Sequence, residues 1–501
     1  MANAIYKLAS PLHGLDTISS LSEMQEGFAI TIDNYFCDNT CLSLRKGYRQ
    51  FLKFNTSSPL KTLIPFVEKG QILATAGNQI FVSTKEEAIE DNIISDIMYW
   101  CYYNHRIFMC NGADNAKVWD GENLTDVNFT INGQEEADLK FASCGVANNQ
   151  LLFWYADNLG FYYAPNGNIA GELNFFDLSQ IAKKGGYLQT VATWGKDSSQ
   201  GYNKYIAFIT SEGEIIVYQG NNFGDANNIY LVGSFFTGRP IGRNCVMNWG
   251  ADLIIITDRG YLAMSDITKN GEIAKASNLF SDKISGYVID KATIYSSQYG
   301  WKGVIVSSEN FALFNVPLEN SFEQHIMNLN TGAWCRFKDI LAYDWLEWDN
   351  KLLFAGDLGT VYVYTGSSDN GEAIKGEIRN IYSKLGTDNQ KLILLYGPRI
   401  EANSNLQVSY SLGIDYKAPD FEYAPISEDE GFYWASEDTA PEIGEFWNEG
   451  YWGGGLQNRN QWMSISGYCN TASLGIKTQT NNVNINIYET LFRYEIAQGA
   501  L

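Results

Sequence analysis

The stretch IAFITSEGEIIVYQG (206–220) decides the fold, because two apolar runs are separated by a short polar turn that contains a glycine. An apolar strand, a polar turn and a second strand rich in Tyr, Val or Ile predict a β-hairpin. The same pattern occurs six more times. These stretches begin at Ile72, Ile107, Leu151, Leu253, Val304 and Leu352.

Successive hairpins begin 35, 44, 55, 47, 51 and 48 residues apart, a mean near 47. A repeat of roughly 40–50 residues that carries hairpins is typical of a β-propeller blade, a small sheet that buries its faces against its neighbours. Seven hairpins favour seven blades. Six blades are the alternative, because the first hairpin is short and fits a composite closing blade. Two unrelated β-sandwich domains are a further alternative, since sandwiches also have regularly spaced strands.

The repeat stops at Gly366, where GSSDNGE (366–372) resembles an interdomain linker. The later strands alternate apolar and polar residues, as half-buried antiparallel strands do. We therefore predict an all-β chain with a β-propeller over 1–366. A C-terminal β-sandwich or barrel-like domain follows over 367–501, with an acidic, Trp-rich excursion at about 415–461.

The chain is strongly acidic, with 57 Asp and Glu against 35 Lys and Arg and a net charge of −22. This composition disfavours a dedicated nucleic-acid-binding surface, which is normally basic. No apolar run is long enough for a membrane span, and no secretion signal is evident. The eight cysteines are too scattered for a disulfide framework.

The sequence indicates no catalytic site, cofactor site or metal site. His13, His105 and His325 are isolated from one another, and none belongs to a metal-binding spacing. The hairpin turns carry acidic residues, which we interpret as turn formers because Asp caps backbone groups there. These residues are Asp157, Glu212, Asp258, Glu309 and Asp357.

Two groups of residues are candidate contacts with another subunit or a partner. The first is the basic segment RKGYRQFLK (45–53), with Arg45, Lys46 and Arg49; its competing interpretation is a weak nucleic-acid patch. The second contains Trp434, Trp447 and Trp452, since Trp is enriched at interfaces. The alternative for these tryptophans is a platform that stacks on sugar rings.

Three regions together resemble the tail hub, nozzle or packaged-DNA stabilisation proteins of short-tailed bacteriophages. The first, within 14–48, contains Gly14-Leu15-Asp16, Asn34-Tyr35 and Arg45-Lys46-Gly47-Tyr48. The second, 215–265, contains a Tyr-x-Gly loop and Gly-Ala-Asp-Leu (250–253). The third is the C-terminal series of tryptophans. It departs from the family pattern, because Trp-Asn and Trp-Gly replace Trp-Asp.

The resemblance implies a structural virion protein of the tail, assembled in the host cytoplasm. It implies a homo-oligomeric ring, a hexamer, around the DNA channel below the portal, where it helps retain the genome and conduct it during ejection. Its partners would be a portal-side adaptor and other tail proteins, and DNA would pass without tight binding. The alternative function is a carbohydrate-binding or glycan-cleaving propeller that acts as a receptor-binding tail protein.

Overall fold

The structure is a computed structural model that describes residues 3–134, 138–198, 201–225, 227–270, 280–428, 433–434, 444–445, 457–460 and 462–497. The chain forms two compact units. Unit 2 comprises 50–324 and 339–363, and unit 1 comprises 1–49, 325–338 and 364–501.

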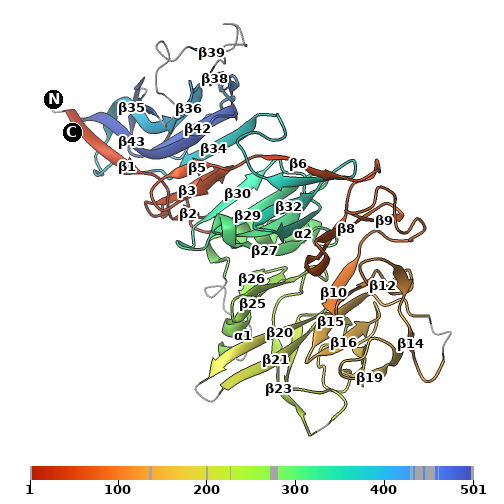
Figure 1. The fold of residues 1–501 in the computed structure, drawn as a ribbon. Coiled ribbons are helices and arrows are strands. Elements are labelled where there is room, and N and C mark those ends of the chain that lie inside the picture. The colour runs from red at the N-terminus through yellow and green to blue at the C-terminus, as the bar shows by residue number, and fades with distance from the viewer. Residues whose placement is uncertain are drawn as a thin grey trace. The chain divides into compact units, whose positions relative to one another are not determined.

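Unit 2 consists mainly of small antiparallel sheets that follow one another along the chain (Figure 1). Six of these sheets have three or four strands. In chain order the first three contain β7 (Thr62–Phe66), β8 (Gln71–Ala76) and β9 (Gln79–Val82); β10 (Tyr99–Tyr103), β11 (Arg106–Cys110), β12 (Lys117–Trp119) and β13 (Leu124–Asp126); and β15 (Ser143–Ala147), β16 (Gln150–Trp154), β17 (Gly160–Tyr163) and β19 (Asn174–Asp177).

The next two sheets contain β20 (Leu188–Ser198), β21 (Gly201–Thr210), β22 (Glu214–Gly220) and β23 (Ile229–Phe236); and β24 (Val246–Trp249), β25 (Asp252–Thr257) and β26 (Gly260–Ala263). A hairpin of β27 (Lys302–Val306) and β28 (Phe311–Pro317) follows. The sixth sheet contains β31 (Asp344–Trp348), β32 (Lys351–Ala355), β33 (Thr360–Tyr364) and β6 (Tyr48–Lys53).

The first strands of these sheets contact one another in the order β10, β15, β20, β24, β27, β31 and β7. An apolar core fills the remaining junction, between β7–β9 and β11–β12, and includes Ile64, Phe66 and Met109. Sheets that stack face to face around an axis in this way make unit 2 a β-propeller.

All seven predicted hairpins are present. Six of them are the second and third strands of a blade, whereas the hairpin that begins at Val304 is the pair β27 and β28, which lies outside the six sheets of three or four strands. Unit 2 therefore has six blades of three or four strands, which is the alternative blade number predicted from the sequence. The β27–β28 hairpin occupies a seventh place around the axis, between β24 and β31. The composite blade joins β6 to β31–β33; it is not the blade of the first hairpin.

Apolar side chains between neighbouring blades hold the propeller together. Phe161 of β17 stacks on Phe208 of β21, with ring centroids 4.8 Å apart, and Phe223 meets both rings at their edges. All three side chains are buried. Burying one such side chain contributes roughly 1.5–3 kcal/mol, so repeated junctions of this kind stabilise stacked sheets that are too small to be stable alone.

Unit 1 has two large sheets (Figure 1). In the first, the strand order is β4 (Tyr35–Cys37), β5 (Leu42–Leu44), β43 (Ile485–Ile496), β35 (Lys391–Ala402) and β40 (Gln457–Asn460), with β1 (Asn3–Ala9) also on β43 and β41 (Met463–Cys469) on β35. In the second, the order within unit 1 is β30 (Trp334–Lys338), β2 (Gly14–Leu15), β3 (Phe28–Asp33), β34 (Ile374–Asn380), β42 (Ala472–Asn481) and β36 (Val408–Ile414).

Side chains between the two sheets pack as in a sandwich. The hydroxyls of Tyr35 on β4 and Thr478 on β42 are 2.7 Å apart and buried. The rings of Tyr396 on β35 and Tyr410 on β36 meet edge to face, 6.3 Å apart. These contacts give the C-terminal strands a core of their own.

The compact units do not follow the predicted division into 1–366 and 367–501. The reason is long-range strand pairing. β1 pairs with β43 from Asn3↔Glu495 to Ala9↔Glu489, and β3 pairs with β34. The first 49 residues therefore complete the C-terminal sheets instead of the propeller, and only β6 returns to a blade.

Candidate functional site

Arg45 is buried inside unit 1, with 2% of its surface exposed. Its Nε donates to Asn34 Oδ1 at 2.8 Å, and its two terminal nitrogens donate to the Asp369 carboxylate at 2.8 and 2.7 Å. Further bonds reach the carbonyls of Lys46 and Lys338. Arg45 is thus a buried connector within this chain, which corrects its interpretation as an exposed contact residue.

The rest of the basic segment is exposed. Lys46 follows Arg45, and Arg49 and Lys53 lie on β6, where every second side chain lies on the same face of the strand. Lys46 and Arg49 remain candidate contact residues. The predicted cluster is therefore divided into one internal cation and three on the surface.

The tryptophan group is described only in part. Trp434 lies on β38 (Tyr433–Trp434), which pairs in parallel with β39 (Gly444–Glu445). Trp447 and Trp452 lie outside the described residues. Their role as partner contacts, or as a sugar platform, stays a prediction.

Unit 2 has a cavity of about 420 Å³ at the propeller axis. Residues from all seven first strands line it: β7, β10, β15, β20, β24, β27 and β31. A second cavity, of about 170 Å³, shares Tyr99, Arg243 and Asn244 with the first and extends along 296–301. The charged residues that line the two cavities are Arg243, Lys302 and Asp344.

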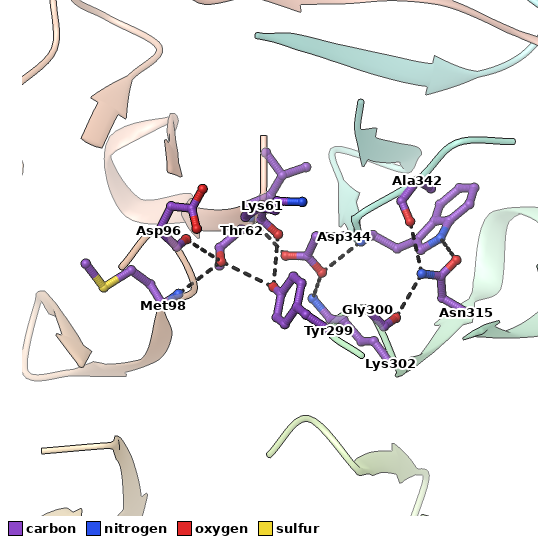
Figure 2. Close-up of polar contacts among 12 residues, drawn as sticks. Lys61, Thr62, Asp96, Met98, Tyr299, Gly300, Lys302, Asn315, Ala342 and Asp344 are labelled. Carbon is purple, nitrogen blue, oxygen red and sulfur yellow. Dashed lines mark hydrogen bonds and ion pairs between the residues drawn. The ribbon is translucent and has the colours of Figure 1, made fainter. Parts of the chain in front are cut away.

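Asp344 ties three first strands together (Figure 2). Its Oδ1 lies 2.6 Å from Nζ of Lys302 on β27, and its Oδ2 accepts the N–H of Leu63 on β7 at 2.9 Å. Asp344 itself belongs to β31 and is buried. A buried carboxylate is stable only with such partners, so these contacts hold the closing blades in place.

Tyr299 adds a second set of contacts near the same junction (Figure 2). Its hydroxyl donates to the Lys61 carbonyl at 2.9 Å and lies 3.3 Å from Thr62 Oγ1, which also accepts the N–H of Met98. Burial raises the pKa of Tyr299 well above its ordinary value, and the charge of Asp344 acts in the same direction. The phenol is therefore a neutral donor, not a general base, at ordinary pH.

Arg243 binds the backbone of two preceding blades. Its Nη1 donates to the carbonyls of Leu188 and Gln189 at 3.1 Å each, and its Nη2 donates to the Ala156 carbonyl at 3.4 Å. The guanidinium also lies over the ring of Tyr187, 5.6 Å from its centroid. Burial lowers the pKa of Arg243 from its ordinary value, but a guanidinium in a protein stays charged.

The acidic residues of the hairpins lie in turns, as predicted. Four are between the second and third strands of a blade, and Glu309 ends η4 (Ser307–Glu309) between β27 and β28. Asp258 Oδ1 accepts the N–H of Arg239 at 2.9 Å, and Asp357 Oδ1 accepts the hydroxyl of Tyr343 at 3.1 Å. Bonds of this kind hold loops together, as expected for turn-forming acids.

The three histidines have separate surroundings. His105 is in the β10–β11 turn with its Nδ1 2.9 Å from Glu68, His13 lies against the ring of Phe28, and His325 is buried. Across the described ranges, no group of three or more His, Cys, Asp or Glu side chains is placed to hold a metal ion. Within the same ranges, no helix has the length and hydrophobicity to cross a membrane.

Sequence reasoning missed Arg243, Tyr299, Lys302 and Asp344. The repeat was recognised by its hairpins, which in most blades are the second and third strands, whereas the axis is lined by first strands. The sequence signal that could have identified Lys302 and Asp344 was their position at the start of a strand. Lys302 begins a strand that enters the hairpin at Val304, and Asp344 begins the strand just before the hairpin at Leu352.

Comparisons with known proteins give similarity at the level of three-dimensional structure. No protein-family model and no curated protein matches the sequence. One similar solved structure is YCF48 bound to D1 peptide, at 9% identity and a TM-score of 0.36, covering 64% of this chain and 94% of that one. Another is BBS1N in complex with ARL6DN, soaked with lead, at 10% identity and a TM-score of 0.34, covering 65% of this chain and 99% of that one.

Apo AztD from Citrobacter koseri is similar at 11% identity and a TM-score of 0.31, covering 56% of this chain and 72% of that one. All three of these similarities have TM-scores below 0.5. The assignment of a propeller therefore rests on the order, pairing and packing of the strands in unit 2.

Proposed function

We propose that the chain is a structural protein of a short-tailed bacteriophage tail. In this proposal it forms a homo-oligomeric ring, a hexamer, around the DNA channel below the portal. It helps retain the packaged genome and conducts it during ejection. Its partners are a portal-side adaptor and other tail proteins, and it resides in the virion.

The observation that carries the proposal is where the residues of the resemblance lie. Asn34 and Arg45, from two separate family-like motifs, are hydrogen-bonded to each other, Arg45 also binds Asp369, and all three residues are buried. Gly14-Leu15, from another motif, forms β2 in the same unit. The shared residues thus build an internal framework, as motifs of a structural family should.

A scaffolding role also accounts for the polar groups at the propeller axis. Asp344, Lys302 and Tyr299 bind one another or the backbone across blade junctions. A catalytic carboxylate would need to face a substrate, whereas this one is held by Lys302 and two backbone N–H groups. We propose that the protein acts by geometry and charge and catalyses no reaction.

The genome would pass between copies of the chain and not through the propeller. A cavity of about 420 Å³ has the volume of a sphere about 9 Å across. The major groove of duplex DNA is alone about 12 Å wide. A channel for the duplex must therefore be formed by several copies around a common axis, because a heterologous interface that closes produces a ring.

Negative-stain electron microscopy of the purified full-length protein, with and without the portal-side adaptor, tests the proposal. We expect closed rings under at least one condition. Monomers under both conditions, together with saturable binding on a glycan array, would instead support the carbohydrate-binding alternative. Mass photometry of the same samples gives the subunit number independently of particle orientation.

A further inference from the structure

The two adjoining cavities at the propeller axis have a positive lining on an acidic protein. Arg243 and Lys302 contribute two positive charges and Asp344 one negative charge, and Lys302 and Asp344 pair with each other. The positive charge of Arg243 is therefore not balanced by another charged residue of the lining. The whole chain, by contrast, has a net charge of −22.

Arg243 has hydrogen-bonding capacity that the described part of the chain does not use. A guanidinium has five N–H donors. Nη1 uses two of them on the Leu188 and Gln189 carbonyls, and Nη2 uses one on the Ala156 carbonyl. Nε–H and the second Nη2–H have no partner among the described residues, and neither ion pair nor hydrogen bond joins Arg243 to a described carboxylate.

The surroundings suit a small anion. Nε–H and Nη2–H form one edge of the guanidinium, whose spacing matches two oxygens of a carboxylate or phosphate. Asn244 and Tyr99, which line both cavities with Arg243, offer further polar atoms. The charge of the Asp157 carboxylate raises the pKa of Arg243 only weakly, less than Tyr99, Tyr187 and Cys245 do.

We propose that the axial cavities form a binding site for a small oxyanion with a carboxylate or phosphate head, held by the Nε–Nη2 edge of Arg243. The carbonyls of Ala156, Leu188 and Gln189 fix the guanidinium before the anion arrives, so little side-chain entropy is lost on binding. Volumes of about 170 and 420 Å³ admit a free metabolite-sized anion. This site is independent of ring formation.

Thermal unfolding and equilibrium dialysis of the full-length protein test the site, with inorganic phosphate and malonate as probes and sodium chloride at matched ionic strength as the reference. We expect a saturable rise in Tm with at least one probe. Arg243→Gln should weaken binding by about tenfold or more, the loss of one charge-assisted bidentate contact. Arg239→Gln is the matched control and should bind like wild type, because Arg239 is exposed and pairs with Glu212.

Arg243→Lys provides a second variant in case the glutamine variant does not fold. Lysine keeps the charge and can still donate to a backbone carbonyl, but it lacks the planar edge, so binding should again weaken. If Arg243 had only a structural role, its replacement would lower stability by the same amount with and without the probes. No saturable shift in the wild type, or an equal shift in the folded Arg243 variants, would overturn the proposal.

Discussion

Arg45 connects three parts of unit 1 through one guanidinium. Its side chain has no exposed surface, and its partner Asp369 lies 324 residues later in the chain. Neither charge is stable alone at this depth, because a buried ion without its counterion is poorly solvated. The pair therefore makes the position of the N-terminal segment depend on the C-terminal strands.

We predict that Arg45→Met lowers the free energy of unfolding by about 3–5 kcal/mol, the usual cost of leaving one member of a buried ion pair without its partner. Arg49→Met, four residues later and exposed, should change it by no more than about 0.5 kcal/mol. Urea denaturation followed by circular dichroism measures both. Similar losses in the two variants would contradict the account of Arg45.

Gly47 is required by close packing of two backbone segments. An added Cβ at this position would lie 1.9 Å from the carbonyl oxygen of Ser368. We predict that Gly47→Ala costs about 1–3 kcal/mol of stability through overpacking. Gly145→Ala is the control, since its Cβ would meet nothing closer than 3.5 Å. Comparable Tm values for the two variants would show that the segments are not packed as described.

At the scale of elements, the propeller depends on contacts between first strands. Asp344 accepts hydrogen bonds from Lys302, the Leu63 N–H and the Trp345 N–H. We predict that Asp344→Ala destabilises unit 2 by about 2–4 kcal/mol, because a cation and two N–H groups lose their acceptor. Hydrogen exchange should increase first in β7, β27 and β31.

The control for this prediction is Asp290→Ala. Asp290 lies on α2 (Ser285–Tyr295) and is exposed. Its replacement should leave both the stability and the exchange pattern of the first strands near wild type. Uniformly faster exchange across unit 2 in the Asp344 variant, with no preference for the three strands, would argue against local closure at this residue.

The elements also show what could be predicted from the sequence. The hairpins were predictable because apolar runs and turn residues lie within about 15 residues of each other, as in 206–220. The pairing of β1 with β43 was not, because it joins Ala4 to Tyr494 and leaves no local pattern. Nor was the burial of Arg45, since nothing near it in sequence indicates Asp369 as its partner.

At the scale of the whole molecule, the proposed passage of DNA depends on the charge of the protein. The chain has 22 more acidic than basic residues, and 415–449 contains eleven acids and one base, Lys417. Affinity for DNA comes largely from basic groups that displace counterions from the phosphates. Acidic walls would keep the duplex away from the protein and let it slide without tight binding.

We therefore predict that the isolated protein does not bind duplex DNA, even at ~10–20 mM salt, where the Debye length is roughly 20–30 Å. A mobility-shift titration measures this. Tight binding that weakens steeply as salt rises would contradict the prediction and identify a basic track. Lys46, Arg49 and Lys53 would then be the first residues to replace, because they are exposed.

The central claim is that several copies of this chain surround the path of the genome. A cryo-electron microscopy reconstruction of the virion in which we propose that the protein resides tests it most directly. The account predicts a closed ring of six copies below the portal, coaxial with the DNA, with each propeller beside the channel. A single copy away from the symmetry axis, or a density map of the tail into which the propeller cannot be fitted, would contradict it.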